Sequence, residues 1–205
     1  MQKLVIPRKT VYRLSLYYRA LHRLKDDSIE TVSSAALAKA AGVKPPQLRK
    51  DLAYFGQFGT RGLGYNVDAL TARLNAVLGT KHPPVILIGT GNLGSALLRY
   101  PGFAQEGLEV VAAFDLEATR KRSQRLGVRV LPMTKLRDFV RENRIKLAIV
   151  TVPAKVAQQV ADALVESGVL AILNFAPVIL QVPAKVVVNN VDLAIELENL
   201  SYFIQ

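Results

Sequence analysis

A short glycine-rich segment near the middle of the chain has the residue types and spacing to bind a phosphate group. Residues 85–88 (Val-Ile-Leu-Ile) predict a buried strand, residues 95–98 predict a helix, and the segment between them fits G-x-G-x-x-G. The first glycine allows a tight turn, the second lets backbone approach a pyrophosphate, and the third lets helix and strand pack closely. We therefore expect a dinucleotide site made by Gly89, Thr90, Gly91, Asn92, Leu93 and Gly94. A glycine-rich turn without a ligand is the alternative.

An acidic residue follows at the distance that a dinucleotide site requires. Asp115 ends a second apolar run, residues 110–114, about 20 positions beyond the glycines. A carboxylate there can accept hydrogen bonds from the ribose hydroxyls of NAD and repels the 2′-phosphate of NADP. The basic residues 120–122 keep NADP open as an alternative, because cationic side chains after the second strand can bind that phosphate.

The positive charge of the chain is concentrated in its first 80 residues. The formal net charge is +11; residues 1–80 hold 13 Lys or Arg against 5 Asp or Glu, and residues 81–205 hold 14 against 11. A compact basic segment favours a polyanionic partner, nucleic acid first of all. A charge that serves only solubility is the alternative.

Three helices are predicted in this basic segment, and the last two are typical of a helix-turn-helix. Apolar residues recur at helical spacing from Val11 to Leu24, and a second helix, capped by serine, stops at Gly42. Prolines 45–46 fit the first turn of a third helix that continues through residues 47–55. The expected DNA contacts of this element are Lys44, Gln47, Arg49, Lys50 and Tyr54. A three-helix bundle with a solvated charged face is the alternative.

A segment with four glycines and several aromatic residues follows the third helix. Residues 56–65 are typical of a short β-hairpin, the wing of a winged helix, with Arg61 near its tip and able to enter a narrow minor groove. A phosphate-binding loop is less favoured, because no Lys-Ser/Thr pair follows. A further helix over residues 67–78 completes the expected winged-helix, DNA-binding domain of residues 1–80, and Lys-His-Pro-Pro at 81–84 breaks the chain.

The rest of the chain predicts a Rossmann domain over residues 81–190. Apolar strands are expected at 85–88, 110–114, 147–152 and 170–175. Because helical stretches alternate with these strands, the fold class is α/β, a doubly wound parallel sheet with an N-terminal winged-helix domain. Residues 191–205 predict an apolar helix that must be buried. It would pack on its own domain or, in exchange, on the partner in a dimer.

The composition excludes several classes of function. The 205 residues include no cysteine, which excludes disulfides, thiol catalysis and zinc-thiolate sites, and we expect no metal. No apolar run approaches the roughly 20 residues that span a bilayer, and the first residues lack the pattern of a signal peptide. We therefore expect a cytoplasmic protein without a membrane partner.

Hydride transfer to a substrate usually needs a proton donor beside the nicotinamide. The two histidines, His22 and His82, lie in the basic helical segment and in the linker, and no Tyr-x-x-x-Lys pair surrounds Tyr100. We therefore expect no catalytic residue and a protein that is not an enzyme. An NAD(P)-dependent reductase with a basic accessory domain, and a module for another nucleotide such as coenzyme A, remain as alternatives.

Several motifs in one order resemble the Rex family of bacterial redox-sensing transcriptional repressors. They are residues 48–56 (Leu-Arg-Lys-Asp-Leu-Ala-Tyr-Phe-Gly), 58–65, 89–94, 100–103 (Tyr-Pro-Gly-Phe), 151–153 and 173–177. The resemblance implies a homodimer that binds double-stranded operator DNA through winged helices and binds NADH or NAD in Rossmann domains. It also implies that rising NADH releases the operator.

The resemblance also implies roles for single residues. The DNA contacts that it implies are Arg49, Lys50 and Arg61. The switch group that it implies, in which pairings change with dimer geometry, is Arg19, Tyr100 and Asp192. Leu193 stands where the family often has an aromatic residue near the partner's nicotinamide, so stacking on that ring would be absent.

NADH and NAD differ chiefly in charge and planarity at the nicotinamide, so groups beside that ring must discriminate between them. Two segments at the carboxyl ends of their strands, 151–153 and 174–177, are placed for this. The further cofactor contacts expected are Tyr100, Pro153, Asn174 and Phe175.

Overall fold

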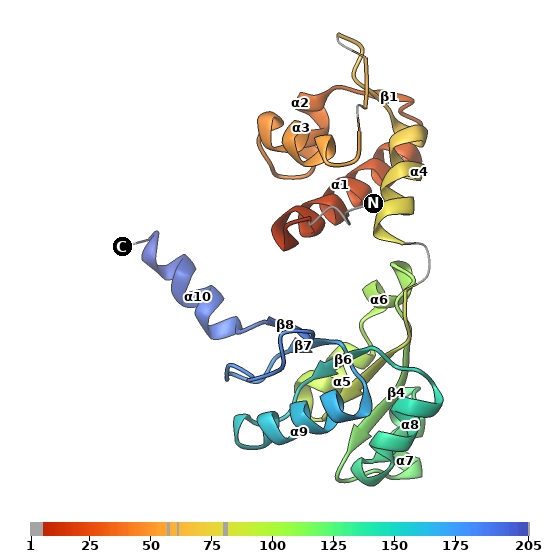
Figure 1. Cartoon of the computed structure of the whole chain (residues 1–205), viewed down its shortest axis with the longest axis vertical. Coiled ribbons are helices and arrows are strands. Elements are labelled where there is room, and N and C mark those ends of the chain that lie inside the picture. Colours follow the sequence, from red (N-terminus) through yellow and green to blue (C-terminus); the bar gives the residue numbers. More distant parts are fainter. Residues whose placement is uncertain (1–5, 57, 61, 80–81, 205) are drawn as a thin grey trace. The chain divides into compact units, whose positions relative to one another are not determined.

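The chain folds into two compact units, residues 1–80 and 81–205 (Figure 1). The computed structural model describes residues 6–56, 58–60, 62–79 and 82–204. Apolar cores form separately in the two units, so each has the packing of an independent fold. Within the described residues, no helix is both long enough and apolar enough to cross a membrane.

The N-terminal unit consists of packed helices and a small antiparallel sheet. Its described elements are α1 (Arg8–Asp26), β1 (Thr31–Val32), α2 (Ser34–Ala40), α3 (Pro45–Ala53), β2 (Tyr65–Asn66) and α4 (Val67–Leu78). The predicted helix-turn-helix, α2 and α3, is confirmed. The Ser33 hydroxyl accepts a hydrogen bond from the Ala36 amide at 3.1 Å, and Pro45 stands in the first turn of α3. Leu48 and Leu52 hold α3 on the core.

A short hairpin follows α3 and completes the winged helix. Thr60 and Gly64 form an antiparallel bridge in which each amide donates to the other residue's carbonyl at 3.1 Å. β2 then pairs with β1, placing Tyr65 opposite Val32. Gly64 has a φ of 91°, and a Cβ there would lie 2.3 Å from the Val32 carbonyl oxygen, so this crossing requires glycine. Arg61, the expected tip of the wing, lies outside the described residues.

The C-terminal unit is a parallel sheet with helices on both faces. Its strands are β3 (Val85–Ile88), β4 (Val110–Asp115), β5 (Val130–Pro132), β6 (Leu147–Val150), β7 (Ala171–Asn174) and β8 (Val187–Asn190). Its helices are α5 (Asn92–Leu98), α6 (Pro101–Gln105), α7 (Arg120–Leu126), α8 (Leu136–Glu142), α9 (Ala154–Ser167) and α10 (Leu193–Tyr202), with a 3-10 turn, η1 (Met133–Lys135).

The strand order β5-β4-β3-β6-β7-β8, with every neighbouring pair parallel, is that of a doubly wound Rossmann sheet. The four predicted strands are present. The two edge strands, β5 and β8, were not predicted. The order reverses between β3 and β6, and ligands of this fold bind outside the carboxyl ends of the strands at that point.

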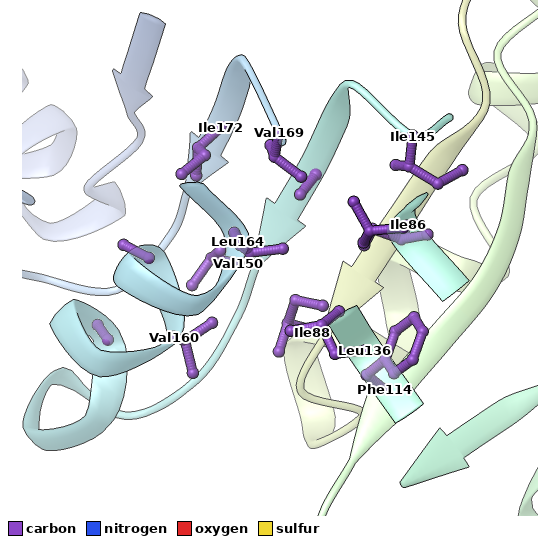
Figure 2. Packing of buried hydrophobic residues seen from close by; sticks show 14 of the residues in the cluster. Ile86, Ile88, Phe114, Leu136, Ile145, Val150, Val160, Leu164, Val169 and Ile172 are labelled. Carbon is purple, nitrogen blue, oxygen red and sulfur yellow. The ribbon is translucent and has the colours of Figure 1, made fainter. Parts of the chain in front are cut away.

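Side chains of the central strand alternate between two apolar layers. Ile86 and Ile88 of β3 belong to one apolar layer with residues of α8 and α9. Figure 2 shows Leu136 beside Ile88 and Phe114, and Leu164 beside Val150. Val85 and Leu87 belong to the other layer, which α5, α6 and α7 cover. Because β3 is buried on both faces, the turn that leaves it is held on a rigid base.

The apolar side chains of the last helix, α10, are exposed to solvent. No described side chain of α10 is buried, and Ile195, Leu197 and Leu200 are 60%, 68% and 63% exposed. The alternative in which this helix packs on its own domain is therefore wrong. An apolar helix that its own chain leaves uncovered is typical of an interaction surface.

Candidate functional site

A cleft of about 1040 Å³ opens at the carboxyl ends of β3, β4 and β6. Small-molecule sites commonly have volumes of roughly 300–1,000 Å³, so the cleft has room for a large ligand. Among the residues expected to bind a cofactor, those that line it are Gly89, Gly91, Leu93, Asp115, Pro153 and Phe175. The glycine turn, the acid that ends β4 and the segment after β6 are thus brought to one place.

The three glycines of the turn serve different purposes. Gly89 has a φ of 94° and its amide donates to the Phe114 carbonyl at 2.8 Å, which makes a tight exit from β3. A Cβ on Gly94 would lie 1.9 Å from the Gly89 carbonyl oxygen, so α5 can begin this close to β3 only with glycine. A Cβ on Gly91 would meet no heavy atom within 4 Å, and this residue lines the cleft. Chain packing therefore does not require glycine at 91, whereas a phosphate close to the backbone does.

Asp115 is fixed at the end of β4 by the glycine turn. Its Oδ2 accepts hydrogen bonds from the amide and the hydroxyl of Thr90 at 2.6 and 2.7 Å, and its Oδ1 accepts one from the Glu117 amide at 3.1 Å. Burial raises the pKa of Asp115, but the hydrogen bonds from Thr90 and Glu117 and the charge of Arg122 outweigh burial and hold that pKa below its ordinary value. The carboxylate is ionised and can accept a further hydrogen bond at Oδ1. Thr90 is 1% exposed and holds the Asp115 carboxylate in place through these two hydrogen bonds.

Arg122 of α7 closes the same end of the cleft. Its Nη2 donates to the Thr90 carbonyl at 2.8 Å and lies 3.8 Å from Asp115 Oδ2, while its Nη1 lies 3.1 Å from the Glu117 carboxylate. The side chain is 19% exposed, and its buried Nε has no hydrogen-bond partner among the described residues. The sequence marked residues 120–122 as a basic group, but within the described chain only this one lines the cleft.

Asn174 ends β7 but is not among the described residues that line the cleft. It is fully buried, and its side-chain nitrogen donates to the carbonyls of Ala176 and Val178 and to Oδ1 of Asn190 at 3.1, 2.9 and 2.9 Å. Its side-chain oxygen accepts from the Ala176 amide at 3.0 Å. The Asn174 side chain is thus bonded to the chain segment that follows Phe175, and its expected contact with the cofactor stays a prediction. Gly94 is buried in the first turn of α5, and Asn92 is exposed at the start of that helix, so neither is among the described residues that line the cleft.

The three residues of the expected switch group lie on different elements. Arg19 is exposed on α1. Tyr100 precedes α6, is 56% exposed, and packs edge-on to Phe103 with ring centres 5.3 Å apart; it does not line the described cleft. Asp192 caps α10 by accepting hydrogen bonds from the amides of Ala194 and Ile195 at 2.9 and 3.3 Å. Their role as a switch stays a prediction.

The basic side chains predicted to contact DNA lie on and beside α3. Lys44 and Lys50 are exposed. Arg49 is also exposed, and its Nη1 donates to the Ser34 hydroxyl of α2 at 3.2 Å, which steadies the guanidinium at the junction of the two helices. Tyr54, directly after α3, is half-buried. The arrangement leaves positive charge on the side of α3 that faces away from the core.

A buried carboxylate that the sequence analysis missed anchors α3 to α1. Asp51 is 1% exposed and accepts hydrogen bonds from Nε and Nη2 of Arg13 at 2.5 and 2.7 Å, from the Tyr17 hydroxyl at 2.7 Å and from the Gln47 side chain at 2.9 Å. Burial raises the pKa of Asp51, but hydrogen bonds from Arg13, Tyr17 and Gln47 outweigh burial and lower it. Gln47, expected among the exposed contacts, is therefore half-buried and held by Asp51. The sequence feature that could have indicated a buried Asp51 is its place between two core leucines, Leu48 and Leu52.

Both units match known protein families. Residues 5–53 match the family described as putative DNA-binding protein N-terminus, and residues 80–178 match the family described as CoA binding domain. Among curated relatives, the redox-sensing transcriptional repressor Rex of Carboxydothermus hydrogenoformans is 48% identical over 201 residues, covering 98% of this chain and 97% of that protein. The protein of the same name from Pelotomaculum thermopropionicum is 44% identical over 203 residues, covering 98% and 95%.

Solved structures of similar proteins include both ligand states. RSP in complex with β-NAD+ and operator DNA is 36% identical, with a TM-score of 0.88 over 98% of this chain and 94% of that chain. RSP in complex with β-NADH is 34% identical, with a TM-score of 0.83 over 98% and 95%. The crystal structure of RSP described as a Rex-family repressor is 35% identical, with a TM-score of 0.85 over 98% and 95%.

Proposed function

The chain belongs to the Rex family of redox-sensing transcriptional repressors, and from that premise we propose that it binds operator DNA and releases it when NADH occupies the cleft. The observation that carries this proposal is similarity to Rex repressors that runs through both units. A helix-turn-helix with a basic surface and a cleft built for a dinucleotide lie in one chain. Such a repressor acts on the chromosome, which agrees with the cytoplasmic location expected.

The proposed DNA reader is α3 with the wing that follows it. Lys44, Arg49 and Lys50 would contact phosphates and base edges in the major groove, and Arg61 would enter the minor groove. Asp51 fixes the angle of α3 on α1, so the basic side chains start from a rigid base. The exposed positions and the positive charge of Lys44, Arg49 and Lys50 support this proposal.

The proposed cofactor is NADH or NAD+, with Asp115 on the adenosine ribose and Gly91 beside the pyrophosphate. Pro153 and Phe175, which follow β6 and β7, would then lie nearest the nicotinamide. The nicotinamide supplies the signal, since oxidation changes its charge and planarity. The described residues that line the cleft include no histidine, tyrosine or lysine, the usual proton donors of hydride-transfer enzymes. This favours a sensor over a reductase.

The proposed active form is a homodimer in which α10 packs on the partner. The open apolar face of α10 supports this exchange, because an apolar helix is stable in water only when covered. Two winged helices related by a two-fold axis would meet half-sites about 34 Å apart, one turn of the duplex. A cofactor-dependent change in dimer geometry would then prevent both half-sites from being engaged. In this arrangement Asp192, which caps α10, and Leu193, its first residue, would approach the partner's cleft.

Fluorescence anisotropy tests the proposal with a palindromic duplex that this protein selects from a random library without NADH. We expect NADH to weaken duplex binding at least tenfold, and NAD+ at equal concentration to leave it strong. Coenzyme A should neither bind nor act. Duplex affinity that stays the same while the cleft is saturated with NADH would contradict the proposal, as would failure to bind any duplex at low salt.

A matched pair of variants separates DNA contact from general charge. Arg49→Ala should weaken duplex binding by about 1–3 kcal/mol, the value of a well-placed arginine contact, with NADH binding unchanged. Arg141→Ala removes an equal charge from an exposed position on α8 and should leave duplex affinity as it is. Equal losses in the two variants would show that α3 is not the reader.

A further inference from the structure

Three charged side chains form a closed group at the ribose end of the cleft. Arg122 Nη1 lies 3.1 Å from the Glu117 carboxylate, and its Nη2 lies 3.8 Å from Asp115 Oδ2. All three residues line the cleft. With one cation and two anions, the group has a net charge of −1.

The two Nη atoms of Arg122 make the hydrogen bonds that hold its guanidinium in place. Nη2 donates to the Thr90 carbonyl at 2.8 Å, Nη1 donates to Glu117 Oε2, and the Nε atom is buried. The Glu117 side chain itself is 85% exposed, so it reaches back from solvent to cover Arg122. Nη1 also lies 3.5 Å from the Glu117 backbone carbonyl. Loss of the Glu117 charge would therefore remove the ion pair at Nη1 and leave the bonds from Nη1 and Nη2 to backbone carbonyls in place.

We propose that Glu117 is a specificity-determining residue that makes the cleft prefer NADH over NADPH, because it occupies the guanidinium that would otherwise bind the 2′-phosphate. The inference rests on the proposed function, that is, on a nicotinamide dinucleotide in this cleft. Asp115 alone does not exclude the phosphate, since the neighbouring Arg122 offsets its charge. The second carboxylate therefore changes the net charge of the group from 0 to −1.

The same geometry predicts what happens when Glu117 is neutral. A phosphate monoester carries about −1.5 to −2 charges at pH 7 and binds well to a planar guanidinium. A group of net charge −1 repels this phosphate. Without the Glu117 charge the group is neutral, and the guanidinium is no longer neutralised by the second carboxylate. Uncharged ribose hydroxyls gain or lose much less from this change.

Isothermal titration calorimetry with NADH and NADPH tests the inference in the full-length protein. The quantity of interest is the ratio of the two dissociation constants, NADPH over NADH. We expect Glu117→Gln to lower that ratio roughly tenfold, the order expected for one added charge-assisted hydrogen bond. In the double variant Glu117→Gln/Arg122→Gln, the ratio should return to the wild-type value or above. Glu142→Gln, which removes an exposed charge on α8, is the matched control and should leave the ratio unchanged.

The outcomes separate this inference from the function on which it rests. If wild type binds neither nucleotide, the proposed function fails and the inference falls with it. If wild type binds NADH and the ratio in Glu117→Gln stays within threefold of wild type, only the role of Glu117 is overturned. A lowered ratio that persists in the double variant also overturns it, because the phosphate would then have another ligand than Arg122.

Discussion

Replacement of Asp51 by asparagine tests the attachment of the proposed recognition helix to α1. The change keeps the shape of the side chain, removes its charge, and places an NH2 group where several donors converge. Arg13 would lose the ion pair and one of its two hydrogen bonds, at 2.5 or 2.7 Å. Either Tyr17, which bonds Oδ2, or Gln47, which bonds Oδ1, would face the NH2 group in place of an oxygen. We therefore expect loss of stability in the N-terminal unit and weaker DNA binding.

The magnitude follows from the burial of the pair. Removal of one partner from a buried ion pair costs about 3–5 kcal/mol. The Arg13 side chain is 21% exposed and can turn toward water, so the lower end, about 3 kcal/mol, applies. In a unit of this size, 1 kcal/mol shifts the melting temperature by roughly 4–8 °C, which gives a fall of about 12–24 °C.

Scanning calorimetry of the full-length protein measures this effect. NADH raises the transition of the unit that binds it, so the transition that NADH leaves in place belongs to the helical unit. In Asp51→Asn that second transition should fall, and the NADH-sensitive one should not move. Asp68→Asn, which breaks the exposed pair with Lys25 at 2.7 Å, is the control and should shift the transition far less. A fall of under about 4 °C in Asp51→Asn would refute the anchoring argument.

The pH dependence of the same variant has a definite sign. The pKa of Asp51 is lowered in the folded state, so its ion pair stabilises the fold above the unfolded pKa of about 3.9 and that contribution is lost as pH falls through the folded pKa. The difference between wild type and Asp51→Asn should be constant above about pH 5 and shrink below about pH 4. A difference that widens on acidification would contradict the assignment.

Two further changes test the cleft and the exposed helix. Gly94→Ala puts a Cβ 1.9 Å from the Gly89 carbonyl oxygen, so α5 must move away from β3. We expect the affinity for NADH, measured by nicotinamide fluorescence, to fall at least tenfold. Unchanged affinity would show that the turn tolerates the shift. Leu197→Asp places a charge on the open face of α10, and light scattering should show monomer where wild type is a dimer; a dimer of undiminished stability would exclude α10 from the interface.

The glycine turn and the helix-turn-helix could be predicted because local chemistry fixes them. Gly89 and Gly94 are required by a positive φ and by a close backbone contact, which leave no other residue type. Ser33 and Pro45 mark helix starts through hydrogen bonding within a few residues. The edge strands were not predictable in this way: β5 is three residues ending in proline and β8 ends in two asparagines, so neither has an apolar period.

The polar residues that organise each unit could not be predicted, since their partners are distant in sequence. Asp51 takes two of its hydrogen bonds from Arg13, 38 positions away, and Asn174 bonds to Asn190 across a strand pair. Spacing places a residue on an element but does not give the direction of its side chain. For this reason Asn174 was expected in the cleft, and Gln47 on the outer face of α3.

The contacts of Asn174 join the floor of the cleft to the last helix. This buried amide fixes the backbone after Phe175, which lines the cleft, and also bonds the Asn190 side chain of β8. Its backbone carbonyl accepts from the Val191 amide at 2.8 Å, and the next residue, Asp192, caps α10. The backbone beside Phe175 and the residue before the Asp192 cap are therefore both bonded to Asn174, one through its side chain and one through its carbonyl. A coupling between the cleft and α10, as the proposed function requires, would need such a connection.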